Sequence, residues 1–495
     1  MVACKGKFLF FIIVLALTLY GRSTILGPTG DIRMTISSAQ PGDTLLLSDG
    51  DYQSPGWLDN KKFMTPVLIK AVNDKKARIV RGNGLNINNC RGLIFDGLEI
   101  TALATNSGLI QIQGQSSYIT IINCHIHHAP LDADCIKVNQ SNNISIIGCQ
   151  LNDPGARAAG NGQQETLDYL DVDTGLIRGC FFTGGTSRQY VNAKGLSSFI
   201  TVENCILKDH NGDQGDAAII LGGWSSESFF AAHPSGYECE NMVVRNNIIL
   251  NSRTGAFQVS NVKNGYIYNN FVWNCKSYNA YRGLIYVSPG NGPGANKGTV
   301  HLEICNNIFA SDAATGAPTQ VLTLSSTTLD SFIHRNNLYY FNGAAIPTGG
   351  YFNPNTEEQA VFENPGFADA RGDSYDAILN SLLPAGRGPW VGTGISALQQ
   401  PFPAVTTDIT SISRNNQIFD IGPFVFQTTT VYNQDLTYRQ QQHRVNSNTT
   451  KTTFLLNGRF MDTGKKGKLR STIVVRFRDD SKTKQFMFQH DRSLD

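Results

Sequence analysis

Three charged residues, Lys137, Asp168 and Lys194, stand on short segments that share one pattern. Each segment alternates apolar and polar residues, continues through a polar turn, and ends in a second apolar strand closed by cysteine. Alternation with a period of two is typical of β-strands, whose successive side chains point to opposite faces. The apolar residues predict the inward face, so the three charges face outward. We expect them on consecutive strands about 5 Å apart, with the carboxylate between two ammonium groups.

This arrangement would suit chemistry on an acidic sugar. A cation beside an anion keeps both charged, so we expect Asp168 to stay ionised and the lysines to keep normal or raised pKa values. Such an array could bind the carboxylate of a uronate. β-Elimination from a uronate also needs a base at C5 and an acid for the leaving oxygen. The catalytic candidates are Lys194 or Tyr190 as the base, and Tyr190 or His210 as the acid.

Further polar residues share or border the same face. Val191 and Ala193 are expected to face inward, which turns Tyr190, Asn192 and Lys194 outward. The candidate substrate-binding residues are Lys137, Asp168, Asn192, Asp134, Glu238 and Arg282. The alternative is an ion-pair ladder that only decorates the surface. Surface ion pairs contribute only about 0–1 kcal/mol each, so stability gives little reason for such a ladder.

No metal or cofactor is predicted. The sequence has no CxxC or His/Cys spacing typical of a zinc site. A calcium ion held by Asp213 and Asp216 is the alternative, although their spacing is more typical of a solvated acidic turn.

The three charged segments belong to a repeat that runs through most of the chain. The residues that close the second strand of each repeat are Gly97, Cys124, Cys149, Cys180, Cys205, Asn247, Asn270, Asn307 and Asn337. The shorter intervals, of 23, 25 and 27 residues, define the basic coil, and the longer ones carry inserted loops. Many short strands at this period, without alternating helices, predict an all-β fold: a right-handed parallel β-helix. The handedness follows from the preference of parallel crossovers.

The closing residues predict two internal stacks. Four cysteines, Cys124, Cys149, Cys180 and Cys205, are expected to stack inside the solenoid as reduced thiols that behave as small hydrophobes. The four later asparagines are expected to stack as amides, each bonded to its neighbours. Nine cysteines follow residue 23, an odd number, so at least one has no disulfide partner within the chain.

The rest of the chain predicts three parts. Residues 1–23 combine lysines with a 13-residue apolar run, shorter than the roughly 20 residues that span a bilayer. This predicts a signal peptide and a secreted, extracellular protein, with an uncleaved membrane anchor as the alternative. Residues 24–427 predict the β-helix, with a short capping helix over residues 31–39 and a tail that folds back along the solenoid. Residues 428–495 predict a small basic β appendage of three strands.

Charge and sequons add two expectations. The formal net charge is +2, which gives no electrostatic case for nucleic acid as a partner. We expect a monomer that acts on an acidic polysaccharide. Asn139, Asn143 and Asn448 begin acceptor sequons for N-glycosylation. A glycan at Asn139 or Asn143 would crowd the charged face.

The segments DCIKV, LDYLDVDTGLIRGC, VNAKG, AAIILGG and YECENMVVRNN resemble, in this order, a group of secreted right-handed parallel β-helix proteins of the pectate lyase-like superfamily. The resemblance covers residues 30–427 and implies a fold like that of β-helix polysaccharide lyases. The residues that it carries over are Asp134, Lys137, Asp168, Lys194, Gly195, Gly222, Gly223 and Glu238. This chain has Leu196 after Lys194-Gly195 and Ile220 before the glycine pair, where the group has glycine and asparagine.

Three functions remain open from the sequence. The first is a polysaccharide lyase. The second is a glycosidase of the polygalacturonase type, because DADCIKV resembles the D-D-C-I-A-I segment of those enzymes. Its acid and base would be Asp134 and Asp168, although lysines beside Asp168 would make that residue a poor acid. The third is a non-catalytic protein that binds polysaccharide or has a structural role at a surface.

Overall fold

The computed structural model describes residues 21–102, 107–156, 164–184, 188–212, 215–223, 225, 235–279, 282–289, 297–325, 327–396, 405–414 and 419–426. It also describes the backbone of residues 469–479 and 482–492. The chain divides into two compact units, Met1–Gln427 and Thr428–Asp495. Among the described residues, no helix has the length and apolar character needed to cross a bilayer.

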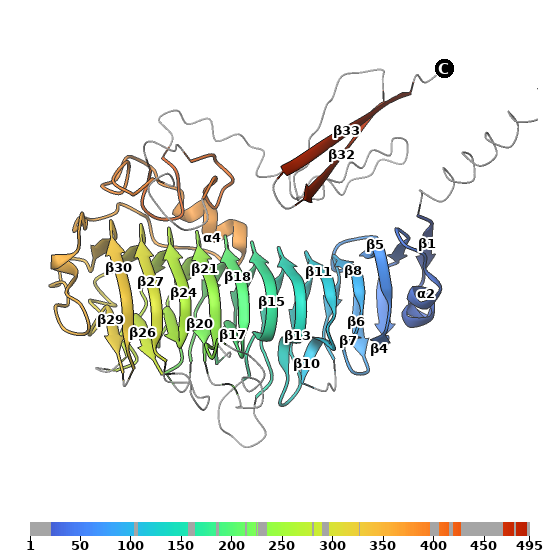
Figure 1. Ribbon diagram of the computed structural model, residues 1–495, viewed down its shortest axis with the longest axis horizontal. Helices are drawn as coiled ribbons and strands as arrows, with labels where there is room; N and C mark the ends of the chain where they lie inside the picture. The colour runs from blue at the N-terminus through green and yellow to red at the C-terminus, as the bar shows by residue number, and fades with distance from the viewer. Residues whose placement is uncertain are drawn as a thin grey trace, which may run out of the picture. The chain divides into compact units, whose positions relative to one another are not determined.

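Parallel strands stack along the first unit in three ladders, which confirms the prediction of a parallel β-helix (Figure 1). The first ladder runs through β4 (Gly56–Asp59), β7 (Leu85–Asn88), β10 (Gly108–Gln113), β13 (Asp134–Ile147), β15 (Leu167–Arg178), β17 (Val191–Lys194), β20 (Ile219–Gly222), β23 (Phe257–Ser260), β26 (Ile285–Ser288) and β29 (Leu322–Leu324). The long strands β13 and β15 continue into the second ladder and join the two into one sheet.

The other two ladders complete each coil. The second ladder runs through β1 (Ser23–Leu26), β2 (Thr44–Leu47), β5 (Lys62–Ala71), β8 (Arg91–Asp96), β11 (Ser117–Ile122), β13, β15, β18 (Ser197–Glu203), β21 (Cys239–Arg245), β24 (Val262–Tyr268), β27 (Thr299–Cys305) and β30 (Leu329–Arg335). The third ladder is an 11-stranded sheet of β3 (Gly50–Gln53), β6 (Ala77–Arg81), β9 (Glu99–Ile100), β12 (His125–His127), β14 (Gln150–Asn152), β16 (Phe181–Thr183), β19 (Ile206–Lys208), β22 (Ile248–Leu250), β25 (Phe271–Trp273), β28 (Ile308–Ala310) and β31 (Leu338–Tyr340). Inward-facing apolar side chains from all three ladders fill a continuous core.

From β8 to β30, a left-handed glycine or asparagine directly follows each strand of the second ladder. Its φ lies between 53° and 71°, as at Asn246 (53°), Asn123 (54°) and Gly97 (71°), because these residues tolerate positive φ. The next residue points inward. The prediction for Gly97 was therefore wrong by one position: Gly97 is the left-handed residue, and the buried Leu98 aligns with Cys124.

The internal stacks otherwise follow the prediction. Cys124, Cys149, Cys180 and Cys205 are all buried on consecutive coils. The nine cysteines of the described part are all free thiols. The asparagine stack follows on the next coils, and its side chains are completely buried. Asn247 Oδ1 accepts a hydrogen bond from the Cys205 backbone N–H at 2.9 Å, which joins one stack to the other.

The two ends of the solenoid are covered by helices or tail. Helix α2 (Ile32–Ser38) confirms the predicted cap: Asp31 accepts from the Met34 N–H at 2.9 Å, and Ile32 and Ile36 are buried. After β31 come a 3₁₀ turn, η1 (Pro354–Thr356), and helix α4 (Tyr375–Leu382).

The tail packs on the outward face of the third ladder. There α4 buries Ile378, Leu379 and Leu382 in one cluster with outward residues of β16 to β31, such as Phe271. This covers the half of the third ladder whose outward residues are apolar.

In the second unit, β32 (Leu469–Asp479) pairs antiparallel with β33 (Lys482–Arg492). These are two of the three strands predicted for the appendage. The third, over residues 453–460, lies outside the described residues.

Candidate active site

The charged cluster lies on the outward face of the first ladder, near the middle of the solenoid (Figure 1). Lys137 on β13 and Asp168 on β15 are direct neighbours in the strand register, as predicted. Lys137 Nζ is 2.7 Å from Asp168 Oδ2. The Asp168 side chain is completely buried, whereas 22% of the Lys137 side chain is exposed.

Lys194 reaches the same carboxylate from a different position. The register neighbour of Asp168 on β17 is Asn192, and Lys194 pairs with Leu170. The prediction of three charges in one row was therefore wrong for Lys194, which stands two residues further along. Its side chain reaches back diagonally, so that Nζ lies 3.0 Å from Asp168 Oδ1. The carboxylate still lies between two ammonium groups.

Two more carboxylates complete the cluster. Asp134 Oδ2 is 3.0 Å from Lys137 Nζ, and its side chain is buried. Glu165 was not predicted; its Oε1 lies 3.6 Å from Lys194 Nζ. The sequence did hold a signal, since Glu165 precedes Asp168 by three residues as Asp134 precedes Lys137. The cluster thus contains three carboxylates and two ammonium groups.

The pKa values follow from burial and these contacts. Burial opposes ionisation of Asp168, but the Lys194 and Lys137 ammonium groups outweigh it and lower its pKa to about 2. Burial also opposes the charge on both lysines, yet Asp168 raises the pKa of each. Lys137 gains a second close aspartate, so its pKa is raised strongly. For Asp134, burial raises the pKa well above its usual range.

The three carboxylates were also tested as a cation site. One oxygen from each of Asp134, Glu165 and Asp168 lies within 4.8 Å of the others. However, Lys137 and Lys194 already direct their ammonium groups at these oxygens. The set therefore fits a lysine pair, not a calcium ion.

Tyr190 does not belong to the outward face, so the prediction for it was wrong. It precedes β17, its side chain is completely buried, and its hydroxyl donates to the Lys208 carbonyl oxygen at 2.5 Å. The alternation found in β17 does not extend to this residue. Its hydroxyl is turned away from the charged cluster and cannot serve there as base or acid.

His210 is also a buried structural residue. Its Nε2 lies 2.9 Å from the Arg188 carbonyl oxygen, and its Nδ1 lies 3.0 Å from Ser252 Oγ. Burial lowers its pKa to about 4, so it is neutral at neutral pH. The prediction of His210 as an exposed acid was therefore wrong.

Glu238 positions the site instead of lining it, which corrects its prediction as a substrate-binding residue. Its side chain is completely buried and accepts from the Gly195 N–H and the Ser225 hydroxyl, both at 2.9 Å. Its backbone oxygen accepts from the Leu196 N–H at 2.8 Å. Leu196 has φ of 76°, a conformation that glycine adopts more easily. Glu238 thus holds the strained turn directly after Lys194.

Arg282 contacts a different part of the surface. Its Nη1 donates to the Gly215 carbonyl oxygen at 2.8 Å and lies 3.9 Å from Asp216 Oδ1. Asp216 also accepts from Arg188 and Gln189 side chains. These cations and donors surround the Asp216 carboxylate, and Asp213, the other residue of the calcium alternative, lies outside the described residues. No contact brings Arg282 to the charged cluster among the described residues.

Uncharged amides flank the cluster on the same ladder. Asn192 Nδ2 donates to Glu165 Oε1 at 3.4 Å. Within the described part of the chain, the buried side-chain oxygens of Asn139, Asn192 and Gln258 accept no hydrogen bond. Asn139 and Asn143 lie on β13, and the third predicted sequon, at Asn448, lies outside the described residues.

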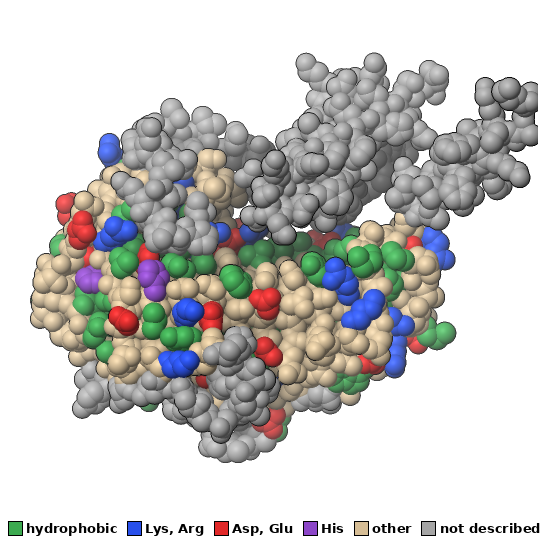
Figure 2. All heavy atoms as spheres, in the orientation of Figure 1, with side chains coloured by type: hydrophobic (Ala, Val, Ile, Leu, Met, Phe, Trp, Pro, Cys, Tyr) green, Lys and Arg blue, Asp and Glu red, His purple; other side chains and the backbone are tan. Residues whose placement is uncertain are grey.

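On the face in Figure 2, acidic and basic side chains lie scattered among polar ones, and basic side chains gather toward the N-terminal coils. The close packing of five charged groups in the cluster is a local feature. It comes from adjacent strands of one ladder.

Comparisons with known proteins agree with the architecture. Neither a family model nor a curated protein matches the sequence. Among solved structures, the chain is similar to pectate lyase Pel9A at 12% identity, with a TM-score of 0.44, over 82% of this chain and 97% of that one. It is similar to alginate lyase AlyF-OU02 at 11% identity, with a TM-score of 0.43, over 83% and 97%. An alginate lyase from Paenibacillus sp. FPU-7 shows 14% identity and a TM-score of 0.39, over 64% and 99%.

The parallel β-helix fold of this chain is shown by its own strand pairing.

Proposed function

We propose that the protein is a secreted polysaccharide lyase that cleaves a uronate-containing polysaccharide by β-elimination. One observation carries the proposal: two ammonium groups flank the buried Asp168 carboxylate on an outward strand face. Ion pairs there contribute little to stability once the cost of removing charges from water is counted. A site that neutralises a substrate carboxylate gives the arrangement a reason to exist.

In this proposal Lys137 binds the substrate carboxylate. Its two aspartate contacts raise its pKa and keep it protonated at neutral pH. A uronate carboxylate beside this fixed cation loses part of its negative charge. That makes the proton on C5 more acidic, which is the first requirement of β-elimination.

Lys194 is the proposed base. It has one carboxylate partner at 3.0 Å and a second only at 3.6 Å, so its proton is held less firmly than that of Lys137. Nζ takes the C5 proton, the C4–O bond breaks, and the leaving oxygen takes a proton from water. The raised pKa of Lys194 leaves only a small fraction neutral near pH 7. Turnover should therefore increase as the pH rises toward that pKa.

The glycosidase alternative fits the geometry less well. Oxygens of Asp134 and Asp168 approach within 4.8 Å, short of the roughly 6.5–9.5 Å between the carboxyl groups of inverting enzymes. The pKa values alone do not oppose this alternative, because burial raises the pKa of Asp134, as an acid needs, while the pKa of Asp168 is lowered to about 2, as a base needs; the short separation is what argues against it.

Binding of a polysaccharide without cleavage is a second candidate. It is favoured by the burial of both predicted proton donors, Tyr190 and His210, away from the cluster. The partly exposed Lys137 and Lys194 would then bind the polymer by charge and hydrogen bonds alone.

A screen of the purified protein distinguishes these functions. Alginate, pectate and glycosaminoglycans are incubated with the protein, while absorbance of unsaturated uronates and reducing ends are measured together. The lyase predicts both signals on one of these polymers. Reducing ends without the absorbance would support the glycosidase, and binding without either signal would support the non-catalytic function.

Secretion is part of the proposal and rests on the sequence pattern of residues 1–23. Mass spectrometry of the mature protein from its native source would give its N-terminus and the occupancy of Asn139, Asn143 and Asn448. A new N-terminus near residue 24 is expected. Full occupancy at Asn139, two residues from Lys137 on the same strand, would argue against a polymer lying along this face.

A further inference from the structure

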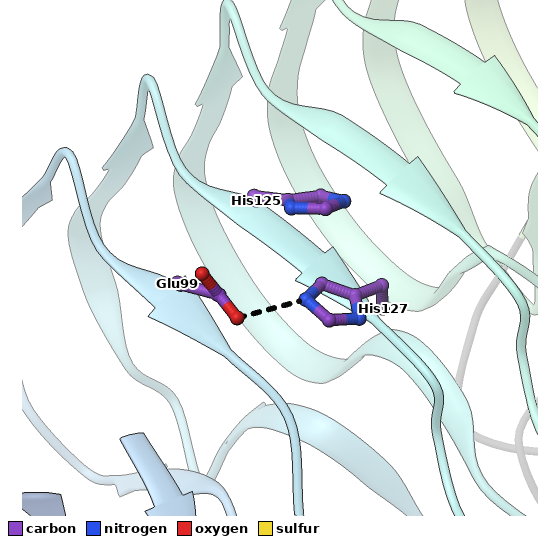
Figure 3. Close-up of side chains that lie close together, drawn as sticks. All are labelled: Glu99, His125 and His127. Carbon is purple, nitrogen blue, oxygen red and sulfur yellow. Dashed lines mark hydrogen bonds and ion pairs between the residues drawn. The ribbon is translucent and has the colours of Figure 1, made fainter. Parts of the chain in front are cut away.

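A second group of chemically active side chains lies on the third ladder, away from the charged cluster. Glu99 on β9 and His125 on β12 are direct neighbours in the parallel register. His127 follows two residues later on the same strand face, and Ile126 between the two histidines is buried in the core. Figure 3 shows the carboxylate and the two imidazoles lying close together on neighbouring strands.

The three side chains form a compact set of possible ligands. One ligand atom from each lies within 4.8 Å of the other two. His127 Nε2 is 3.3 Å from Glu99 Oε1. The rings of His125 and His127 lie with their centroids 4.0 Å apart. Two imidazoles and a carboxylate therefore converge from adjacent coils.

Neighbouring groups orient the His125 imidazole. Asn152 Oδ1 lies 3.0 Å from His125 Nε2. The Asn152 amide nitrogen donates to Asp153, so its oxygen must face the histidine. Nε2 of His125 then carries the proton, and Nδ1 keeps its lone pair. Metal-binding histidines are commonly fixed by a hydrogen bond from the other ring nitrogen in this way.

His127 is oriented in a similar manner. Its Nδ1 lies 2.5 Å from His128 Nδ1, while its Nε2 faces Glu99. With the proton on Nδ1 shared with His128, Nε2 is left as the ligand atom. Burial lowers the pKa of both His125 and His127, so the two imidazoles are neutral at neutral pH.

Packing does not account for these residues. From β16 onward the outward residues of the third ladder are apolar and contact the tail, as Phe271 does. Glu99, His125 and His127 lie before that point on the ladder and are half-buried. Elsewhere on the solenoid one histidine alone contacts a glutamate: His301 Nε2 is 2.8 Å from Glu303 Oε1.

We propose that Glu99, His125 and His127 form a binding site for a divalent transition-metal ion of the zinc class, which links two adjacent coils. Two imidazoles and one carboxylate are a donor set that Zn²⁺ takes, with a fourth position open to water. The imidazoles select against calcium and magnesium, which prefer oxygen ligands. The site is independent of the proposed lyase function.

The test uses the tag-free full-length chain with Zn²⁺, and Co²⁺ as a spectroscopic probe. Calorimetry should show one equivalent of Zn²⁺ bound, Co²⁺ should give visible absorption, and Zn²⁺ should raise the Tm because it binds only the folded chain. His125→Ala and His127→Ala should abolish all three signals. Glu99→Gln should weaken Zn²⁺ binding at least tenfold, and Asn152→Ala roughly 10–100-fold, as is usual for groups that orient a ligand.

His301→Ala is the matched control, because it removes an imidazole bonded to a glutamate where no second imidazole is present; it should leave Zn²⁺ binding unchanged. Glu99→Gln keeps the shape of its side chain, so it remains informative if a histidine variant folds poorly. The proposal is overturned if the parent chain takes up no Zn²⁺. It is also overturned if Glu99→Gln binds Zn²⁺ as tightly as the parent, or if His301→Ala loses as much affinity as His127→Ala.

Discussion

Two polar arrays run across the coils of this solenoid, and they differ in what holds them together. The asparagine stack is neutral, and its amides are bonded on both sides: Asn270 Nδ2 donates to Asn307 Oδ1 at 3.0 Å, and Asn270 Oδ1 accepts from Asn247 at 3.0 Å. The Glu357 carboxylate closes the stack at Asn337.

The charged cluster is different in each respect. It brings three carboxyl groups and two ammonium groups largely out of water. It also stays partly open, since 14% of the Lys194 side chain is exposed. A buried neutral array whose polar groups are all hydrogen-bonded can be present because it stabilises the fold. Buried ion pairs are weak evidence for stability, because removing charges from water costs free energy. The comparison separates a structural array from one that needs a functional reason.

The largest expected effect is on turnover in the charged cluster. Lys194→Ala should lower the rate of unsaturated product formation roughly 10²–10⁴-fold, because a positioned base contributes about that factor. Its stability loss should be about 1.5–3 kcal/mol, the contribution of a hydrogen bond to a charged group. Kinetics on the preferred polymer and chemical denaturation check both values. If the variant is unfolded, or if it keeps full activity, Lys194 has a structural role like that of the asparagine stack and is not the catalytic base.

The next effect is on stability in the asparagine stack. Asn270→Ala should cost about 3 kcal/mol or more, since it leaves several buried donors and acceptors unbonded at about 1–3 kcal/mol each. Urea denaturation measures the loss, and kcat of the folded fraction should not change. Asn270→Cys is the matched variant, because cysteine fills the same register position on earlier coils, and it should lose less.

A smaller effect should appear in acid. Asp168 has its pKa lowered to about 2 in the folded protein, so its ion pairs contribute stability above the ordinary aspartate pKa near 4. That contribution disappears as the pH falls from about 4 to 2, and it amounts to about 2 kcal/mol. The difference in unfolding free energy between the parent and Asp168→Asn should therefore be constant above pH 4 and shrink below it. A difference that grew in acid would mean that Asp168 is not held as a carboxylate.

The smallest effect is expected for a lysine–aspartate pair outside the cluster. Lys70 and Asp96 are register neighbours on the second ladder, with Nζ 2.5 Å from Oδ2. Lys70→Ala should change stability by at most about 1 kcal/mol and leave polymer cleavage unchanged. This is the matched control for Lys194→Ala, and a similar loss of activity in both would remove the distinction between a surface pair and the site.

Alternation and spacing predicted the solenoid, both internal stacks and the outward position of Lys137 and Asp168, because each follows from the period of two within a strand. They failed where strands end. Tyr190 precedes β17, so alternation does not apply to it. The turn of Gly195 and Leu196 follows Lys194 and lengthens the segment between β17 and Cys205. Counting residues back from Cys205 therefore placed Lys194, instead of Asn192, beside Asp168.

Two groups were missed because their partners come from other coils. Glu165 joins the cluster through Lys194 and through its backbone N–H, which donates to Asp134 Oδ1 at 3.1 Å. The segment His125-Ile126-His127 has none of the cysteine-containing spacings typical of zinc sites, so the sequence alone did not predict a metal site there. Glu99, 26 residues earlier, becomes their neighbour only when one coil stacks on the next.

The most direct measurement of the central claim is a structure of the protein with a bound oligouronate from the polymer it prefers. We predict a sugar carboxylate within hydrogen-bond distance of Lys137 Nζ, with C5 facing Lys194 Nζ. An oligouronate bound on another face, with the Lys137–Asp168–Lys194 cluster closed and unchanged, would contradict the account.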